Sequence, residues 1–331
     1  MRAQERLQLA LDTGLLALSE RDRIAVFGPR AGTDLSVLPQ DRCDLILTFR
    51  PDVDHFESTG WSCRLTPAGR YGAGIVFAAR AKALSLARLA AAAEVCDAPL
   101  VVDGAKTDGI EALLKACRAR GAVSEPLSKA HGKLFTFDPG SGVADWVARP
   151  PAALVEHRFL TAPGVFSSDG IDPASALLAD TLPVRIGATV ADLGAGWGYL
   201  SARVLERDTP IELHVVEADH VALDCARRNV DDSRAQFHWA DATHWRAPGP
   251  LDAVVMNPPF HAGRTGDPDL GRAFIAAAAR ALGPRGTLYM VANRHLPYEA
   301  ELTRCFGHVV SVGTDRRFKV YHASRPARPA R

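Results

Sequence analysis

The sequence LDAVVMNPPFH, residues 251–261, changes character at its midpoint. Its first six residues are mostly apolar, which is typical of a buried strand in a parallel sheet. Pro258 and Pro259 then each fix φ at about −65° and lack a backbone N–H. The residue before a proline is held in extended geometry, so Asn257 is restricted as well. A stiff corner rich in free carbonyl groups therefore follows the strand, at the edge of an α/β sheet where ligands bind.

This corner offers groups that could hold a flat ring carrying an –NH₂ group. The Asn257 side-chain carbonyl and a nearby backbone carbonyl, such as that of Pro258, can accept both amine hydrogens. Phe260 can lie flat against the ring. Asn257, Pro258 and Phe260 are therefore the candidate catalytic residues, and a side-chain amide would fit the same groups. The alternative is that Asn-Pro-Pro only ends a strand and opens a turn.

Composition excludes several classes of protein. The 331 residues are enough for two domains, and 47% of them are hydrophobic, which is ample for two cores. The net charge is only +1, so a nucleic-acid partner would need a local basic patch. The six cysteines are scattered without a Cys-x-x-Cys pair, which indicates neither a disulfide framework nor a zinc site. We expect a cytoplasmic monomer without metal, secretion signal or membrane span.

Strands and helices alternate along the chain, which predicts an α/β fold with mostly parallel sheets. Asp172 and Pro173 predict the start of a helix that runs to Leu182, with Asp172 as its N-cap. In the second half, five α/β repeats end in an antiparallel hairpin, which is more than a plain dinucleotide-binding pattern. We divide the chain at its glycine- and proline-rich stretches into a first domain, a linker, a second domain and a disordered tail, at residues 1–137, 138–158, 159–323 and 324–331.

The two halves also share a pattern. DLILTFRP at 44–51 resembles DAVVMNPP at 252–259, and we predict a long helix over the alanine-rich residues 75–95 after the first of these strands. Only 14 residues separate Pro29 from Asp44, too few for the elements that precede the later strand. We interpret the first domain as a degenerate, shortened copy of the second.

A glycine-rich turn is predicted between the first strand and first helix of the second domain. Asp192, Gly194, Gly196 and Gly198 form the pattern Asp-x-Gly-x-Gly-x-Gly. Glycines allow a tight turn and a close approach to a ligand. The N-terminus of the following helix can receive a carboxylate or a phosphate.

Two acids follow the next two strands. Glu217 lies 25 residues after Asp192, where a carboxylate suits the ribose hydroxyls of an adenosine-containing cofactor. Asp241 follows the third strand and is placed to meet the adenine amine. The alternative for each acid is that it only caps the segment after it.

In these features the chain resembles the class I S-adenosylmethionine-dependent methyltransferases, and more closely the bacterial ribosomal RNA (guanine-N2)-methyltransferases. The resemblance covers about 160–323, and covers the first half more loosely because that family also has a degenerate N-terminal methyltransferase-like domain. One departure is Trp197, a bulky residue in the glycine turn. The stretches that carry the resemblance are PGVFSSDG at 163–170, DLGAGWG at 192–198, NPPFH at 257–261, VANRHLPY at 291–298 and FKVY at 318–321.

The resemblance implies methyl transfer from S-adenosylmethionine to an exocyclic amine, most closely N2 of a guanine in ribosomal RNA, with the small subunit favoured. Two fixed acceptors would favour a pyramidal nitrogen aimed at the methyl group. The target base must be unpaired or flipped out. The residues implied for the cofactor are Asp192, Gly194, Gly196, Gly198, Glu217, Asp241 and Asn257, and those for the substrate are Phe260, His261 and Lys319.

Alternatives stay open at this stage. His261 could be a structural histidine, and Lys319 could be a solvated lysine of an edge strand. The Asn-Pro-Pro-Phe motif also occurs in adenine-N6 and protein-glutamine methyltransferases, so a protein-glutamine or small-molecule methyltransferase is one alternative function. A non-catalytic RNA-binding or ribosome assembly factor is another. The expected partner is ribosomal RNA or a ribosomal subunit.

Overall fold

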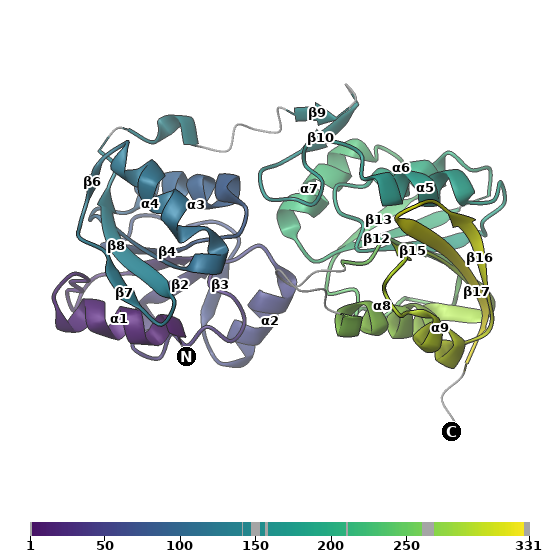
Figure 1. The fold of residues 1–331 in the computed structure, drawn as a ribbon, viewed down its shortest axis with the longest axis horizontal. Helices are drawn as coiled ribbons and strands as arrows, with labels where there is room; N and C mark the ends of the chain where they lie inside the picture. Colours follow the sequence, from purple (N-terminus) through teal and green to yellow (C-terminus); the bar gives the residue numbers. More distant parts are fainter. Residues whose placement is uncertain are drawn as a thin grey trace. The chain divides into compact units, whose positions relative to one another are not determined.

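The computed structural model describes residues 2–140, 142–146, 153–155, 158–209, 211–259 and 268–327. Phe260 and His261 lie outside these residues. The chain forms two compact units, Met1–Pro150 and Pro151–Arg331, called unit 1 and unit 2 here (Figure 1). No helix of the described residues is both long and apolar enough to cross a membrane.

Unit 1 is built on one sheet with the strand order β3-β2-β1-β4-β5-β8-β6, in which β7 also pairs with β8. The strands from β3 to β5 are parallel, and β8 is antiparallel to its neighbours. Helices α3 and α4 lie on one side of the sheet, with α1 and α2 on the other (Figure 1). The strands are β1 (Ile24–Phe27), β2 (Cys43–Ile46), β3 (Ser62–Arg64), β4 (Ala73–Phe77), β5 (Leu100–Ala105), β6 (Ala122–Val123), β7 (Leu127–Lys129) and β8 (Gly132–Asp138). The helices are α1 (Arg2–Asp12), α2 (Arg50–Ser58), α3 (Lys82–Val95) and α4 (Ile110–Arg118), with short 3₁₀ turns η1 (Gln40–Arg42), η2 (Lys106–Asp108) and η3 (Ala144–Trp146).

Unit 2 has a seven-stranded sheet with the order β13-β12-β11-β14-β15-β17-β16, preceded by a small β9-β10 hairpin. The first five strands in this order are parallel, and β17 runs antiparallel to both β15 and β16. The strands are β9 (Ala153–Val155), β10 (Phe159–Thr161), β11 (Thr189–Leu193), β12 (Glu212–Glu217), β13 (Ala235–Trp239), β14 (Leu251–Met256), β15 (Leu282–Asn293), β16 (Phe306–Thr314) and β17 (Phe318–Pro326). The helices are α5 (Pro173–Thr181), α6 (Tyr199–Leu205), α7 (His220–Asn229), α8 (Pro268–Ala281) and α9 (Glu299–Cys305). The predicted parallel repeats with a closing antiparallel hairpin are confirmed.

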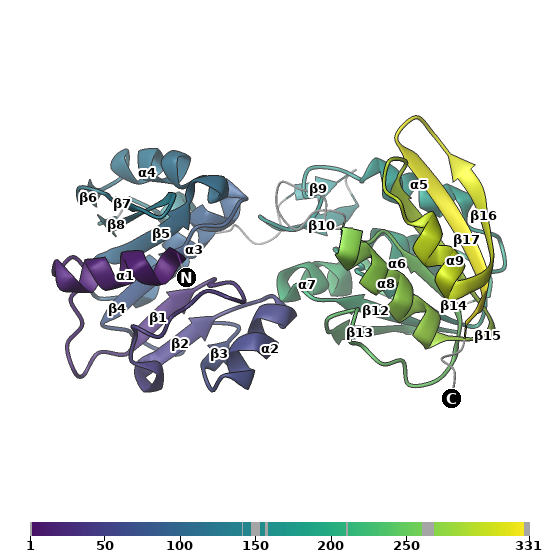
Figure 2. The same ribbon diagram turned by 60° about the horizontal axis from the view of Figure 1, so that its bottom comes forward.

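Two hydrophobic cores fix the sheet of unit 2 between its helices. One core joins α5, α6 and α7 to one face through residues such as Val190 and Val255. The other joins α8 and α9 to the opposite face through Ala191 and Met256. Alternate residues of each strand point to opposite faces, so both faces of these central strands are apolar. Figures 1 and 2 show α8 and α9 side by side, across the sheet from α5 and α6.

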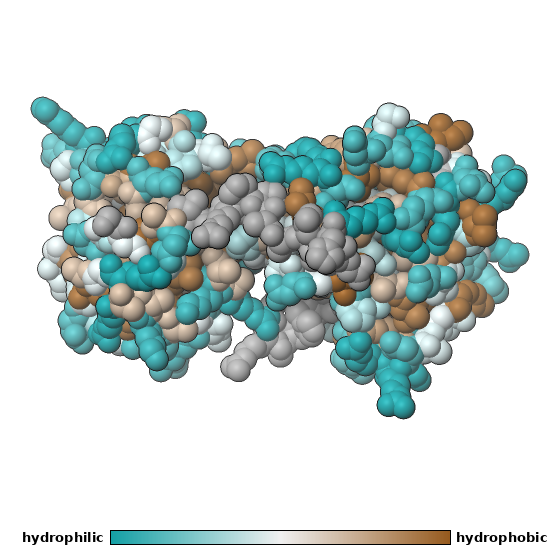
Figure 3. Space-filling view, turned by 90° about the horizontal axis from the view of Figure 1, so that it is seen from above, coloured by the Kyte–Doolittle hydropathy of each residue, from teal (hydrophilic) through white to brown (hydrophobic). Residues whose placement is uncertain are grey.

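Few large hydrophobic side chains are exposed among the described residues. On the face drawn in Figure 3, hydrophobic residues lie singly or in small groups among hydrophilic ones, as in most soluble domains. The large hydrophobic side chains that are exposed among the described residues are Phe49, Phe166, Val184, Ile211, Val310 and Val312. Two of these, Val310 and Val312, lie on the edge strand β16.

Three predictions about the chain's elements were wrong. The helix predicted over 75–95 begins only at Lys82, because Ile75, Val76 and Phe77 are buried in β4. The strand predicted over 44–51 ends at Ile46, and Pro51 opens α2, where a missing N–H costs nothing. The tail predicted from residue 324 is still paired through Pro326 in β17. The predicted linker also contains regular structure, since η3 and β9 lie within it.

The repeat was therefore matched to the wrong strand. In strand order, β2 is the counterpart of β12, and the counterpart of β14 is β4. Unit 1 has a strand at each of the seven positions of this order, and a clear difference lies between β1 and β2, where η1 stands and unit 2 has the helix α6 between β11 and β12.

Candidate functional site

The glycine turn joins β11 to α6 in the predicted strand–turn–helix context. Gly194, Gly196 and Gly198 have φ of 75°, 57° and 91°, in the left-handed region that favours glycine. A Cβ at Gly198 would also lie 3.0 Å from Cγ2 of Val230, whereas one at Gly196 would meet no atom of the described residues within 4 Å. The turn therefore packs tightly against neighbouring residues at Gly198 and leaves space beside Gly196.

Asp192 lies fully buried at the end of β11. Its Oδ2 accepts a hydrogen bond of 2.7 Å from the Ser201 hydroxyl, and its Oδ1 has no partner among the described residues. Burial, with a smaller contribution from the charge of Glu217, raises the pKa of Asp192 to about 7. A buried carboxylate oxygen without a partner is costly, so it marks a place where a ligand could donate.

Glu217 ends β12 and is tied to the glycine turn. Its Oε2 accepts from the Gly196 N–H and its Oε1 from the Asp219 N–H, both at 2.8 Å. Burial raises the pKa of this carboxyl. The contact with Asp219 is the local capping that was the alternative for this residue. Each carboxylate oxygen has a second lone pair, so Glu217 can still accept from a ligand hydroxyl.

Asp241 makes only local contacts among the described residues. Its carboxylate accepts from the Thr243 N–H at 2.8 Å and the Thr243 hydroxyl at 2.7 Å, and lies 2.7 Å from His244 Nδ1. These are the contacts of a residue that caps a turn. Contact of Asp241 with adenine stays a prediction.

Trp197 does not obstruct the glycine turn. Its side chain is 4% exposed and packs with Phe159 and Tyr199, at ring-centroid distances of 5.2 and 5.9 Å. Its indole N–H donates to the Phe166 carbonyl at 3.0 Å, so it ties the loop before α5 to the glycine turn. The side chain of Phe166 is 63% exposed at this point.

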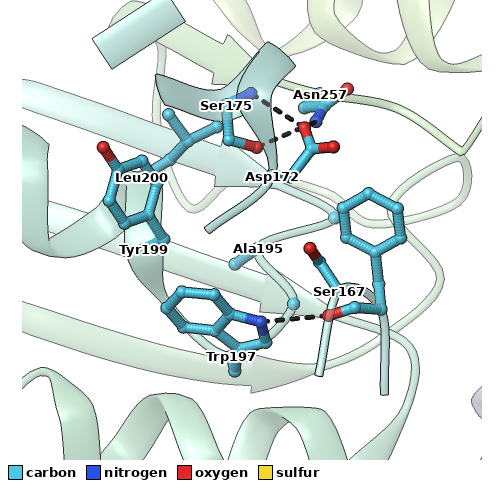
Figure 4. A pocket seen from close by; sticks show the side chains of 11 residues that line it. Ser167, Asp172, Ser175, Ala195, Trp197, Tyr199, Leu200 and Asn257 are labelled. Atoms are coloured by element: carbon cyan, nitrogen blue, oxygen red, sulfur yellow. Dashed lines mark hydrogen bonds between the residues drawn. The ribbon is translucent and has the colours of Figure 1, made fainter. Parts of the chain in front are cut away.

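Asn257, the first residue after β14, is held by the start of α5. Its Nδ2 lies 2.9 Å from Asp172 Oδ2 and 2.8 Å from Ser175 Oγ. Asp172 is the N-cap of α5, as predicted, and the same Oδ2 accepts the Ser175 N–H at 2.9 Å. An ionised carboxylate only accepts hydrogen bonds, so the NH₂ end of Asn257 must face Asp172. The carbonyl end therefore points away from Asp172 and Ser175 (Figure 4).

A pocket of about 380 Å³, including the space open to solvent at its mouth, lies between the glycine turn, the start of α5 and Asn257 (Figure 4). It is concave, and its lining is mostly apolar with a few polar groups. Asp192, Glu217 and Asp241 are not among the described residues that line it. The lining residues are Phe166, Ser167, Asp172, Ser175, Gly194, Ala195, Gly196, Trp197, Tyr199, Leu200 and Asn257.

The predicted substrate residues have different outcomes. Phe260 and His261 lie outside the described residues, and Pro258 is buried directly after Asn257. Lys319 lies on β17, and its Nζ is 2.8 Å from Glu299 Oε1. Its charge is therefore already paired, and β17 lies between β15 and β16, so Lys319 is not the solvated lysine of an edge strand that was the alternative. Contact of Lys319 with the substrate stays a prediction. Sequence reasoning missed the roles of Asp172 and Ser175 at Asn257, because it treated Asp172 only as a helix cap.

Comparisons with known proteins agree with this geometry. Residues 156–322 match the family model described as "Methyltransferase small domain". The ribosomal RNA small subunit methyltransferase C of Hahella chejuensis is 34% identical over 235 residues, which cover 67% of this chain and 68% of the relative. The protein of the same name from Shewanella amazonensis is 28% identical over 302 residues, 84% of this chain and 87% of the relative.

A solved structure has the same fold over nearly the whole chain. It is a 16S rRNA N2 methyltransferase of T. thermophilus, in complex with AdoMet and guanosine. The TM-score is 0.78 at 24% identity, over 98% of this chain and 91% of the other. The two-unit architecture is therefore shared.

Proposed function

Because this chain belongs to the methyltransferase small domain family and to that of the ribosomal RNA small subunit methyltransferases C, we propose that it methylates N2 of a guanine in the RNA of the small ribosomal subunit, with S-adenosylmethionine as cofactor. The observation that carries this proposal is the orientation of Asn257. Its NH₂ end is bound by Asp172 and Ser175, so its carbonyl is the end available to an incoming amine.

The residues around the glycine turn fit an adenosine-containing cofactor with a charged methionine end. Within the described residues, Asp192 Oδ1 is buried without a partner and Gly196 is open, and Glu217 retains lone pairs for ribose hydroxyls. We assign Asp192, Glu217, Asp241 and the three glycines to the cofactor, and Asn257 to the boundary between cofactor and substrate. S-adenosylmethionine supplies an electrophilic methyl group when bound.

Asn257 orients the nucleophile. The lone pair of a guanine N2 is delocalised into the ring, so the amine reacts poorly while it stays planar. The Asn257 carbonyl and the backbone carbonyl of Pro258 can accept its two hydrogens and favour a pyramidal nitrogen. Because Asp172 and Ser175 fix the amide of Asn257, this acceptor needs no reorganisation as the reaction proceeds. Phe260 stacks on the flipped base and His261 flanks it in this proposal.

We assign unit 1 to positioning of the RNA, and unit 2 to cofactor binding and catalysis. The expected location is the cytoplasm, with ribosomal RNA or a ribosomal subunit as partner. We base this assignment on the apolar side chains that unit 1 has at the positions that match Asp192, Glu217 and Asn257 of unit 2.

The test is transfer of a radiolabelled methyl group to purified small subunits, large subunits and bulk cellular protein in parallel. We expect label in small-subunit RNA, recovered as N2-methylguanosine after digestion and mass spectrometry. Label in protein would support the protein-glutamine alternative. Cofactor binding without transfer to any of these substrates would support a non-catalytic assembly factor.

A further inference from the structure

Three arginines, Arg294, Arg316 and Arg317, gather where the β16-β17 hairpin turns, and are called the arginine tip here. All three are exposed. Arg294 holds the turn in place, since its Nη1 donates to the Asp315 carbonyl at 2.9 Å and its N–H to the Arg317 carbonyl at 2.8 Å. The Arg317 guanidinium lies 4.9 Å from the centroid of the Phe318 ring.

Asp315, the acid within the tip, offsets only part of the charge of the three arginines. The Asp315 Oδ1 accepts the backbone N–H of Arg317 at 2.7 Å and that of Phe318 at 2.6 Å. Within the described part of the chain, no carboxylate forms an ion pair with Arg316 or Arg317. Because the whole protein has a net charge of only +1, this is a local concentration of positive charge.

The strand register places the tip at the same edge of the sheet as Asn257. Met256 of β14 is level with Met290 of β15, so Asn257 is level with Val291, which pairs with Val320 of β17. Strands are about 4.8 Å apart and rise about 3.3 Å per residue. Two strand spacings across and three residues along then put the Cα of Arg317 roughly 14 Å from that of Asn257.

We propose that the arginine tip binds backbone phosphates of the RNA beside the target nucleotide, while the base lies at Asn257. Guanidinium groups present a fork of donors that matches a phosphate, and contacts of this kind position a nucleic acid without reading its sequence. The proposal rests on the proposed function for its substrate. It also assigns contact with the RNA to these arginines in place of Lys319, because the Lys319 ammonium group is already paired with Glu299.

Salt dependence of RNA binding tests this proposal directly. The double variant Arg316→Ala/Arg317→Ala is compared with the wild type for binding to small-subunit ribosomal RNA across a series of KCl concentrations. Each lost phosphate contact lowers the slope of log affinity against log salt by about 0.7 for a single strand, so we expect a decrease of about 1.4. The KM for RNA should rise about tenfold or more, with kcat and calorimetric cofactor binding unchanged.

The matched control is Arg285→Ala. Arg285 is also an exposed arginine, near the opposite end of β15, and should leave the slope unchanged. The variant Arg316→Lys/Arg317→Lys keeps both charges, so it should keep the slope but bind more weakly. The proposal is overturned if the salt slope of the alanine double variant is unchanged. It is also overturned if the slope of Arg285→Ala decreases by the same amount. Binding is read without catalysis, so a wild type that methylates no RNA contradicts the proposed function alone.

Discussion

Units 1 and 2 have the same strand order but very different edges. Their registers match, because the Gly28 N–H donates to the Ile46 carbonyl as the Gly194 N–H donates to the Val216 carbonyl. Three polar positions of unit 2 can therefore be compared with their counterparts in unit 1, and all three counterparts are apolar and at most 8% exposed. The pairs are Asp192 and Val26, Glu217 and Leu47, and Asn257 and Phe77.

The space beside the first strand differs as well. Gly28 has φ of 65°, close to the 75° of Gly194. A Cβ at Gly28 would lie 2.1 Å from Cζ of Arg88, so the protein's own side chain occupies this position in unit 1. The shared strand order thus depends on the buried apolar faces, and the sheet of unit 1 forms without polar side chains at these positions of its edge.

Buried carboxylates show the same contrast. In unit 1, Asp103 is 1% exposed and accepts hydrogen bonds from two nitrogens of Arg6, at 2.5 and 2.8 Å. In unit 2, Asp192 is equally buried, but one of its oxygens has no partner in the described residues. A paired buried carboxylate serves the fold, whereas an unpaired one indicates a binding site.

Among the tests of this difference between the units, substitution of Asn257 should have the largest effect on methyl transfer. Asn257→Ala removes one fixed acceptor of the target amine, so methyl transfer should fall by about two orders of magnitude or more. Cofactor affinity should change little. The measurements are single-turnover transfer and calorimetry on the same preparation. Phe77→Leu, at the matching position of unit 1, is the control and should retain normal transfer. Equal loss of transfer and cofactor binding in Asn257→Ala would mean that Asn257 is structural.

Cofactor binding should stabilise unit 2 alone. S-adenosylmethionine at about 100 times its Kd adds roughly 2.7 kcal/mol to the free energy of unfolding of the unit that binds it. Amide exchange should therefore slow in β11 and β12, with β1 and β2 unchanged, and calorimetry should give one site per chain. Two equivalent sites would show that unit 1 also binds the cofactor. That result would contradict the inference from the apolar side chains at its edge.

Cofactor affinity should depend on pH through Asp192. Its pKa is raised to about 7, so the carboxylate is protonated below that pH and ionised above it. The cofactor carries a sulfonium and an ammonium group, so affinity should rise about tenfold between pH 6 and pH 8, about 1.4 kcal/mol. Calorimetry at several pH values measures this rise. Asp192→Asn keeps an acceptor for Ser201 but cannot ionise, so its affinity should be flat with pH. A wild-type profile as flat as that of the variant would exclude the role of Asp192 charge.

The contacts that orient Asn257 should have the smallest effect. Ser175→Ala removes one acceptor of the Asn257 amide but keeps the backbone N–H of residue 175, which Asp172 caps, so transfer should fall about three- to tenfold. Cofactor affinity is the control and should hold.

An exchange of the two partners sharpens this test. In Asn257→Asp alone, two carboxylates would meet, and transfer should be lost at neutral pH. Adding Asp172→Asn supplies a donor to the new carboxylate and keeps a good N-cap, so transfer should partly return. If the double variant transfers methyl groups no faster than Asn257→Asp, residue 172 does not orient residue 257.

Local patterns made much of unit 2 readable from its sequence. The glycine turn and the Asp172 cap depend on neighbours within a few residues, and both were predicted. The contact between Asp172 and Asn257 could not be predicted, because 85 residues separate them and only the fold brings them together.

Unit 1 was harder to predict. Its alanine-rich helix α3 follows β4 closely, so helix propensity masked the β-branched Ile75 and Val76 of the strand. The prolines at residues 51 and 258 also do not show by themselves whether a strand has ended or a helix has begun. Pro51 opens a helix, whereas Pro258 follows a strand.

The position of β17 has a consequence for the order in which the protein folds during synthesis. β17 lies between β15 and β16 in the sheet, although it is translated after both. Until residues 318–326 have left the ribosome, β16 lacks the strand that joins it to the sheet. The sheet of unit 1 is complete at Asp138, so unit 1 can fold while unit 2 is still being translated. A ribosome stalled before Phe318 would thus carry a finished first unit and an unfinished second one.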